Sequence, residues 1–151
     1  MTTLTVGAGA SKAAAYVQNQ ATKLSRQLQK SAVFGVESLI RGELADVWEE
    51  CSEAGWDGYD AFPVTWDSYN NTERFLRAMP LGTCAPSIGA EPDGQMTLEW
   101  GRSKQRRLSV SVSPDGELHY AALLGAEKTC GSVPFFDELP GTILSLIRKV
   151  C

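Results

Sequence analysis

Apolar and polar residues alternate along most of the second half of the chain. Apolar side chains take every second position from Met96 to Trp100 and from Leu108 to Val112, and residues 117–124 continue the alternation. This pattern is typical of antiparallel strands with one buried face and one face in water. The expected strands are residues 87–91, 95–101, 107–113 and 117–124, with a shorter one near 128–133.

The first half of the chain has helical spacing instead, with apolar residues three and four positions apart. Ser11 is a candidate N-cap for a helix through Ser31, because good helix formers dominate this stretch, and Gly35 is a candidate interruption. Between residues 44 and 51, apolar side chains recur at i, i+3, i+4 and i+7. This spacing predicts an amphipathic helix that ends before Gly55.

Two further helices are predicted to cover the sheet. Thr65 is a candidate N-cap for a helix through Met79, which Pro80 ends. Asp137 is a candidate cap for a closing helix that ends near residue 150. The expected inner faces are Tyr69, Thr72, Phe75, Leu76 and Met79 in the first helix, and Ile143, Leu146, Ile147 and Val150 in the second.

The order of these elements indicates the fold class. Pro-Asp-Gly triplets at 92–94 and 114–116 favour tight turns, so the first four strands are expected to form a meander. Helices, a meander and a closing helix together indicate an α+β fold with a four- to five-stranded antiparallel sheet covered by helices. Residues 1–41 are predicted to be a basic helical N-terminal arm, partly flexible and frayed over 1–9, and residues 42–151 a single α+β domain.

The composition is that of an ordinary globular protein, with 151 residues, 43% of them hydrophobic and 21% charged. No apolar run approaches the ~18 residues of a membrane-spanning helix, and no secretory signal pattern begins the chain. Cys51, Cys84, Cys130 and Cys151 are scattered, without a C-x-x-C pair that would indicate a zinc or redox site. We expect a cytoplasmic protein with free thiols and no cofactor or metal, with two disulfide bridges as the alternative.

Charge is segregated along the chain, although the net charge is only −4. Residues 1–41 carry five basic residues and one acidic residue, and residues 42–73 carry nine acidic residues and no Lys or Arg. Residues 102–107 then add four cations. Such asymmetry indicates charged partners, or else pairing within the chain and solvated faces.

Residues 55–63 combine turn-forming residues with three large rings, those of Trp56, Tyr59 and Phe62. Exposed rings are unusual in a surface loop, so these rings are expected to dock on the core and fix the path of the loop. Asp57 and Asp60 are expected to accept hydrogen bonds from backbone amides of the loop. The alternative is an acidic pocket, formed with Glu53, for paired-carboxylate chemistry or a hard cation.

A longer pattern begins with this loop and runs through residues 55–123. It consists of Gly55-Trp56-Asp57-Gly58-Tyr59, Ala61, Pro63, Phe75-Leu76, Pro80, Pro86, Asp93-Gly94, Leu98-Glu99-Trp100, Leu108-Ser109-Val110, Asp115-Gly116 and Tyr120. The pattern resembles a family of small hypothetical proteins of bacteria and phages. The resemblance implies a prokaryotic or phage origin and brings no established activity with it.

No catalytic constellation is recognisable, so no enzyme and no catalytic residue are expected. The single histidine, His119, lies in the strand 117–124, where a structural or surface role is more frequent than catalysis. A Cys–His dyad would need a nearby thiol, and Cys130 is the best candidate because its strand is expected beside that of His119. A small enzyme around these two residues, with Asp57 and Asp60, is the third hypothesis.

The basic loop 102–107 predicts an anion-binding surface. Its cations crowd at the tip of a hairpin, where they can contact phosphates. They are Arg102, Lys104, Arg106 and Arg107, to which the arm would add Lys12, Lys23, Arg26 and Lys30. A nucleic-acid-binding accessory protein is therefore the second hypothesis, although an acidic protein surface would fit the same loop, and a soluble hairpin tip needs no partner.

The acidic stretch supports the preferred hypothesis, a non-enzymatic protein–protein interaction module of bacterial or phage origin. Glu49, Glu50 and Glu53 lie away from the apolar face of their helix, as on the wet face of any amphipathic helix. Alternatively they mimic nucleic-acid phosphates for a basic groove of a partner, as an inhibitor, antitoxin-like or anti-defence protein would. The candidate aromatic anchors are Trp48, Trp56, Tyr59 and Trp66, with core packing as the alternative.

A thin apolar seam in the arm predicts self-association. Val17, Leu24 and Leu28 follow a heptad-like spacing together with Ala21 and Ser31. We therefore expect a homodimer, as well as a protein partner of unknown identity and no membrane contact.

Overall fold

The structure is a computed structural model that describes residues 12–151 of the chain, with side chains for 17–24 and 39–151. The chain divides into two compact units, Met1–Leu39 and Ile40–Cys151. The predicted frayed segment 1–9 and the predicted cap Ser11 lie outside the described residues.

Helix α1 (Lys12–Cys51) crosses the border between the two units. The helix continues through Gly35, which therefore does not interrupt it. A single glycine costs a helix only about 1 kcal/mol relative to alanine, so the flanking helix formers outweigh it. In the last turns of α1, Leu44 and Cys51 are buried, as the amphipathic spacing predicts.

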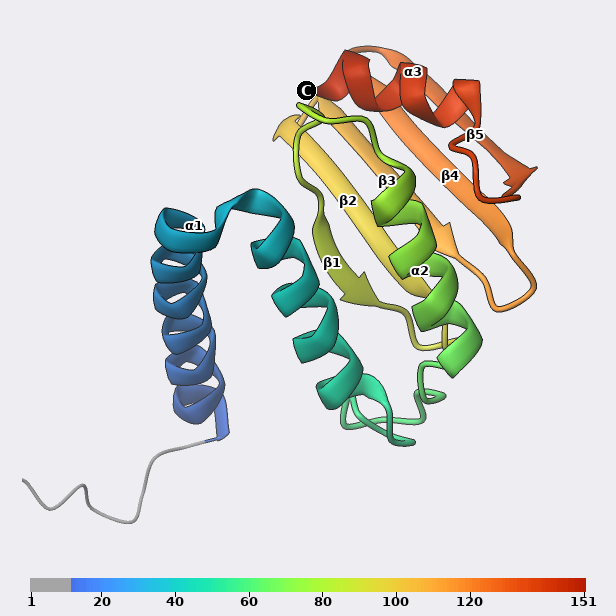
Figure 1. Cartoon of the computed structure of the whole chain (residues 1–151). Helices are drawn as coiled ribbons and strands as arrows, with labels where there is room; N and C mark the ends of the chain where they lie inside the picture. Colours follow the sequence, from blue (N-terminus) through green and yellow to red (C-terminus); the bar gives the residue numbers. More distant parts are fainter. Residues whose placement is uncertain (1–11) are drawn as a thin grey trace, which may run out of the picture. The chain divides into compact units, whose positions relative to one another are not determined.

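The second unit contains a five-stranded antiparallel sheet whose strands lie side by side in chain order (Figure 1). The strands are β1 (Ser87–Ala90), β2 (Met96–Ser103), β3 (Arg106–Val112), β4 (Glu117–Leu124) and β5 (Glu127–Pro134). The predicted meander is confirmed, and β5 extends it. Gly94 and Gly116 in the Pro-Asp-Gly turns have φ angles of 91° and 85°, which favour glycine.

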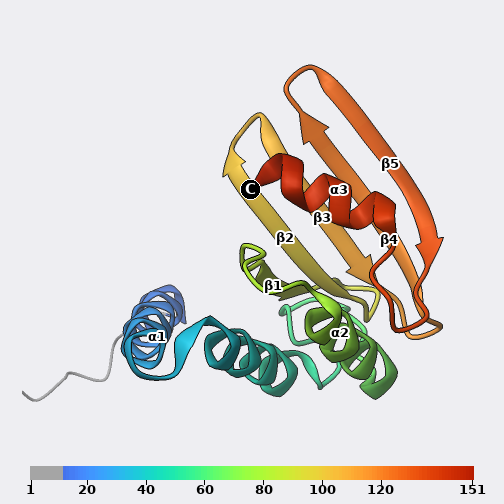
Figure 2. The ribbon, with the colours of Figure 1, turned by 45° about the horizontal axis from the view of Figure 1, so that its top comes forward.

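Helices α2 (Trp66–Ala78) and α3 (Gly141–Val150) cover one face of the sheet (Figure 2). The side chains of Leu98, Val110 and Leu118 on that face are fully buried, as are Phe75 of α2 and Ile147 of α3. Burial of such side chains is the main stabilising contribution to the fold, at about 1.5–3 kcal/mol for each large apolar side chain. The predicted α+β arrangement is therefore confirmed.

The start and the inner face of α2 also agree with the sequence analysis. Thr65 is the N-cap, and its hydroxyl oxygen accepts a hydrogen bond from the N–H of Ser68 at 3.1 Å. The buried face includes the polar residue Asn71, whose amide donates to the carbonyl oxygens of Ser113 (3.1 Å) and Pro114 (3.2 Å). These hydrogen bonds satisfy a buried amide and tie α2 to the β3–β4 turn.

The predicted cap of α3 is wrong. Residues 138–140 separate Asp137 from the first turn of the helix, and an N-cap side chain must stand directly before that turn. Asp137 has a φ angle of 63°, and its carboxylate pairs with the guanidinium of Arg74 in α2. The expected inner face is confirmed, because all four of its residues are buried: Ile143, Leu146, Ile147 and Val150.

Candidate functional site

The loop between α1 and α2 is fixed by its own hydrogen bonds. The Asp57 Oδ1 atom accepts hydrogen bonds from the backbone N–H groups of Tyr59 (2.8 Å) and Ala61 (3.3 Å). The Gly55 N–H donates to the Ala61 carbonyl oxygen (2.8 Å), and the Gly58 N–H donates to the Gly55 carbonyl oxygen (2.9 Å). Asp57 therefore has the capping role that the sequence predicts, and the loop backbone is held in place.

The end of the loop is tied to the rest of the unit. The Val64 N–H donates to the Cys51 carbonyl oxygen (2.8 Å), and the Phe62 N–H donates to the Pro92 carbonyl oxygen in the β1–β2 turn (2.7 Å). A Cβ atom at Gly94 would lie 2.9 Å from the Pro63 carbonyl oxygen, closer than real Cβ atoms approach. Glycine at position 94 therefore lets the β1–β2 turn hold the loop.

Two of the three loop rings are exposed, contrary to the prediction that they dock on the core. Trp56 is half-buried against the core, and its indole N–H donates to the Phe62 carbonyl oxygen at 3.0 Å. Tyr59 and Phe62 keep 85% and 68% of their surface exposed. The prediction was wrong for these two rings because Trp56 and the backbone hydrogen bonds already fix the path of the loop.

Trp66, the first residue of α2, adds another exposed ring, with 58% of its surface accessible. Its ring stacks on Tyr69 with centroids 5.1 Å apart and meets the edge of Trp48 in α1 at 5.4 Å. Such aromatic pairs contribute about 0.5–1.5 kcal/mol each beyond the area they bury. Trp66 is therefore held by its neighbours while more than half of it faces solvent.

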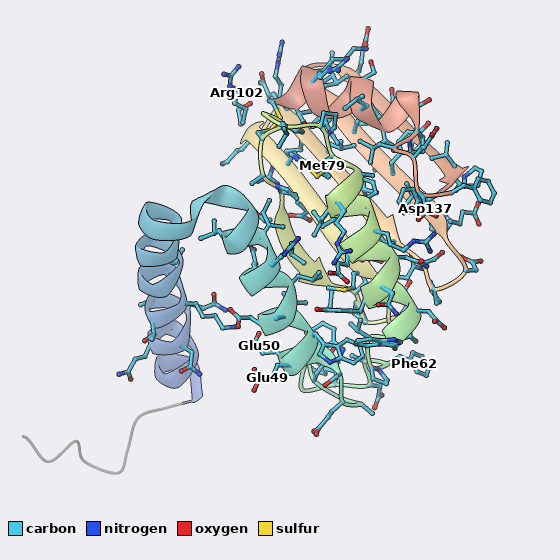
Figure 3. The ribbon with its side chains drawn as sticks, viewed as in Figure 1. Glu49, Glu50, Phe62, Met79, Arg102 and Asp137 are labelled. Carbon is cyan, nitrogen blue, oxygen red and sulfur yellow. A yellow bond between two sulfur atoms is a disulfide. The ribbon has the colours of Figure 1, made fainter. Side chains whose placement is uncertain are left out.

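Exposed carboxylates lie at the same end of the unit as these rings (Figure 3). Figure 3 shows Glu49 and Glu50 of α1 at the same end of the unit as Phe62. The contact of Trp48 with Trp66 and the hydrogen bond of Val64 to Cys51 bring α1, the loop and α2 together here. We name this surface the acidic–aromatic end, and its exposed residues are Glu49, Glu50, Glu53, Tyr59, Asp60, Phe62, Trp66 and Asp67.

The predicted basic loop lies at the other end of the unit, at the tip of the β2–β3 hairpin, where Figure 3 labels Arg102. The structure adds the last turn of α3, because the Arg106 Nη1 atom donates to the Lys149 carbonyl oxygen at 3.2 Å. We name this surface the basic end, and its exposed cations are Arg102, Lys104, Arg106, Arg107, Arg148 and Lys149. Arg148 and Lys149 could not be assigned to this surface from the sequence, because no local pattern relates segments so far apart.

His119 and Cys130 lie on neighbouring strands, β4 and β5, as predicted. The register pairs His119 with Ser132, and the His119 Nδ1 atom lies 2.8 Å from the Ser132 Oγ atom. Asp57 takes part in loop capping, and Asp60 belongs to the same loop between α1 and α2. Among residues 12–151 with described side chains, no group of three His, Cys, Asp or Glu is placed to hold a metal ion.

The uncovered face of the sheet carries a polar row that the sequence analysis did not single out. Thr97, Ser111, His119 and Ser132 lie in register across β2 to β5. The Glu91 Oε1 atom accepts hydrogen bonds from the hydroxyls of Thr97 (2.7 Å) and Ser111 (2.5 Å). The serines that alternate with valines in β3 were the pattern that could have indicated this row.

The apolar seam predicted for the arm is exposed where its side chains are described. Val17 and Leu24 keep 65% and 59% of their surface accessible. The side chain of Leu28 lies outside the described residues. The homodimer through this seam stays a prediction.

Cys84 and Cys151 form a disulfide that joins the segment after α2 to the end of α3. The expectation of free thiols is therefore wrong for this pair, which is separated by 67 residues and so has no local spacing pattern. Of the other two cysteines, both described, Cys51 is buried and Cys130 is exposed, and both are thiols.

Comparison with protein-family models, curated proteins and solved structures finds no match to this chain. The resemblance of residues 55–123 to small hypothetical proteins of bacteria and phages therefore stays a prediction. None of the helices in residues 12–151 has the length and apolarity that crossing a membrane requires.

Proposed function

We propose that this chain is a non-enzymatic protein-binding module whose acidic–aromatic end docks on a basic surface of a partner protein. The observation that carries the proposal is the exposure of Tyr59, Phe62 and Trp66, three rings close together in the sequence, on a segment whose backbone is held by hydrogen bonds. Exposed apolar surface with a polar rim is typical of protein interfaces, and aromatic residues are enriched among those that dominate binding energy.

The fixed loop favours binding because less freedom is lost when the complex forms. Asp57 caps the loop, and Pro92 and Cys51 accept hydrogen bonds from its end. Ordering a mobile side chain at an interface costs about 0.5–1.5 kcal/mol, and a loop ordered in advance avoids the backbone part of such costs. Trp66 is similarly held by Tyr69 and Trp48.

The charge around the rings supports a basic partner. The acidic–aromatic end exposes five carboxylates, and residues 42–73 contain no Lys or Arg, so the rim of this surface attracts cations. Complementary charge mainly raises the association rate and excludes wrong partners. The exposed rings favour a protein interface over pure phosphate mimicry, because mimicry needs negative charge but no apolar anchors. An inhibitor, antitoxin-like or anti-defence role is one use of such an interface, and a bacterial or phage origin rests on the resemblance alone.

A cytoplasmic location belongs to the same proposal. The disulfide between Cys84 and Cys151 argues for the opposite, because disulfides persist mainly in oxidising compartments. Alkylation of free thiols at the moment of cell lysis, followed by mass spectrometry, distinguishes a cytoplasmic location from an oxidising compartment. A cytoplasmic protein is expected to carry the label on both cysteines, whereas unlabelled cysteines that need a reductant first would contradict that location.

Affinity capture from a nuclease-treated lysate tests the proposed interface. The bait is the wild-type chain, the variant F62A/W66A or the control L81A, which removes a fully exposed apolar side chain from the segment after α2. We expect one protein to be captured by the wild type and L81A but lost with F62A/W66A. With that partner purified, loss of the two rings is expected to weaken binding about 30-fold or more. Equal affinity of all three baits would contradict the proposal.

A further inference from the structure

A hollow at the basic end joins the β2–β3 hairpin to the last turn of α3. Its volume is about 580 Å³. It brings together two segments that are far apart in the sequence, held near one another by the Arg106 hydrogen bond to the Lys149 carbonyl oxygen. The polar and basic groups around it come from Ser103, Gln105, Arg106, Gly125, Arg148 and Lys149.

The positive charge at this end is not balanced within the described part of the chain. The hydrogen bond from Arg106 ends on a carbonyl oxygen and leaves the positive charge in place. Of the residues lining the hollow, Glu127 alone carries a carboxylate, against three cations. The negative end of the α3 dipole favours Arg148 and Lys149 without any ligand. The helix dipole does not account for the four cations that the hairpin contributes.

We propose that the basic end binds the phosphate backbone of double-stranded nucleic acid. Phosphate oxygens are contacted in known complexes by Arg and Lys, by hydroxyl and amide side chains and by backbone N–H groups. The hollow offers Arg and Lys, the Ser103 hydroxyl and the Gln105 amide. The cations continue beyond it to Arg102, Lys104 and Arg107, a spread that fits successive phosphates better than one small anion.

The hollow lacks aromatic side chains, and this favours a duplex over single-stranded nucleic acid or a protein as its ligand. None of its lining residues is aromatic. Binding of single strands relies on stacking of bases on aromatic side chains. Protein interfaces are also enriched in aromatic residues, and the lining of the hollow contains none. A duplex presents its phosphates without needing stacking, so its backbone is the ligand that fits this end, bound without sequence preference.

Fluorescence anisotropy with a short labelled DNA duplex tests this proposal. The comparison ligands are the single strand of the same sequence and a labelled polyglutamate peptide. The variants are K104Q from the hairpin, R148Q from α3 and the double variant K104Q/R148Q. The matched control is R77Q, which removes the same charge from an exposed side chain of α2. Thermal unfolding curves verify that each variant is folded.

We expect the duplex to bind more tightly than either comparison ligand, with an affinity that falls steeply as salt is added. K104Q and R148Q should each lower the slope of log affinity against log salt by about one, and the double variant should bind about tenfold more weakly at low salt. R77Q should bind like the wild type. K104Q changes an exposed hairpin tip, so the test stays decisive even if R148Q unfolds.

Several outcomes would overturn the proposal. No duplex binding at low salt, or equal binding by the wild type and K104Q/R148Q, would remove it. An equal loss in R77Q would show attraction by overall charge instead of a defined surface. Tighter binding to polyglutamate would assign the basic end to an acidic protein, and tighter binding to the single strand would exclude duplex recognition. None of these results bears on the acidic–aromatic end, which uses different residues.

Discussion

At the scale of single residues, a few backbone contacts decide how the loop between α1 and α2 presents its rings. Asp57 fixes the interior of the loop through two amide hydrogen bonds. Gly94 allows the β1–β2 turn to approach Pro63, next to the exposed Phe62. The rings are therefore held in their exposed positions by residues that do not belong to the exposed aromatic surface.

Replacement of Gly94 by Ala is expected to lower the free energy of unfolding by about 1–3 kcal/mol. Alanine at this position would keep a φ angle of 91°, which L-residues rarely adopt, and its Cβ atom would lie 2.9 Å from the Pro63 carbonyl oxygen. Gly89→Ala is the matched control, because a Cβ atom there meets nothing within 4 Å. Urea unfolding measures both variants. If G94A is as stable as G89A, the close approach of turn and loop is unimportant.

The Glu43 carboxyl provides a test of buried charge. It accepts a hydrogen bond from the Ile88 N–H of the edge strand β1 at 3.1 Å. Burial raises the pKa of Glu43, an effect that this hydrogen bond opposes and the nearby Asp46 charge reinforces. Because the folded state binds the proton more tightly, the contribution of Glu43 to stability is greatest below the usual pKa of 4.5. That contribution is lost as the pH rises through the raised value.

The variant E43Q is therefore expected to gain stability relative to the wild type at neutral pH, by less than about 1 kcal/mol. Glutamine keeps the carbonyl oxygen that accepts from Ile88 but carries no charge. The gain should shrink as the pH falls to about 4, where the wild-type carboxyl becomes protonated. Chemical unfolding across this range measures the difference. A gain that does not change with pH would contradict the assigned cause.

At the scale of elements, the sequence predicts those helices, strands and caps that depend on residues close together in the chain. The valines and serines of β3 alternate because one face is buried and the other is wet, and this periodicity survives in the structure. Thr65 caps α2 through an amide three residues away, a contact that local spacing can reveal. Asp137 shows the limit of such inference, since its partner Arg74 is in another helix.

Contacts between distant segments could not be read from the sequence. The proximity of Arg106 to Lys149 depends on how α3 lies over the sheet, as does the pairing of Cys84 with Cys151. The expectation that Tyr59 and Phe62 dock on the core was wrong for a different reason. Aromatic composition predicts burial on average, but Trp56 is the one ring of the three that packs on the core, and backbone hydrogen bonds hold the rest of the loop, which leaves the ring of Tyr59 in solvent.

The apolar seam of α1 makes a prediction about assembly. Val17 and Leu24 are exposed, and a heptad-like spacing continues to Leu28 in the sequence. If this seam joins two copies, L24D/L28D should halve the mass measured by sedimentation equilibrium. Burying unpaired carboxylates in an apolar interface costs more free energy than the interface supplies. An unchanged mass would exclude the seam as the dimer contact.

At the scale of the whole molecule, the unit Ile40–Cys151 carries opposite charges at its two ends. The acidic–aromatic end combines carboxylates with exposed rings, and the basic end combines cations with hydroxyl and amide groups. A net charge of −4 conceals this separation. Two surfaces of different chemistry fit a protein that holds two partners of different kinds.

The disulfide secures the basic end, because it joins the end of α3 to the segment after α2. The variant C84S is expected to lower the free energy of unfolding by about 2–4 kcal/mol, since the bridge closes a long loop in the unfolded chain. C130S, which removes an exposed thiol, is the control and should unfold like the wild type. A reductant should destabilise the wild type and leave the stability of C84S unchanged. Equal stability of the wild type, C84S and C130S would show that the disulfide does not stabilise the fold.

The central claim, that the acidic–aromatic end contacts a partner protein, is tested most directly by site-specific photo-crosslinking in the host cell. A benzophenone side chain replaces either Phe62 or, as the control, the fully exposed Leu81. Illumination is predicted to yield one defined protein adduct from position 62, resistant to nuclease, and none from position 81. No adduct from position 62, or the same adducts from both positions, would contradict the claim.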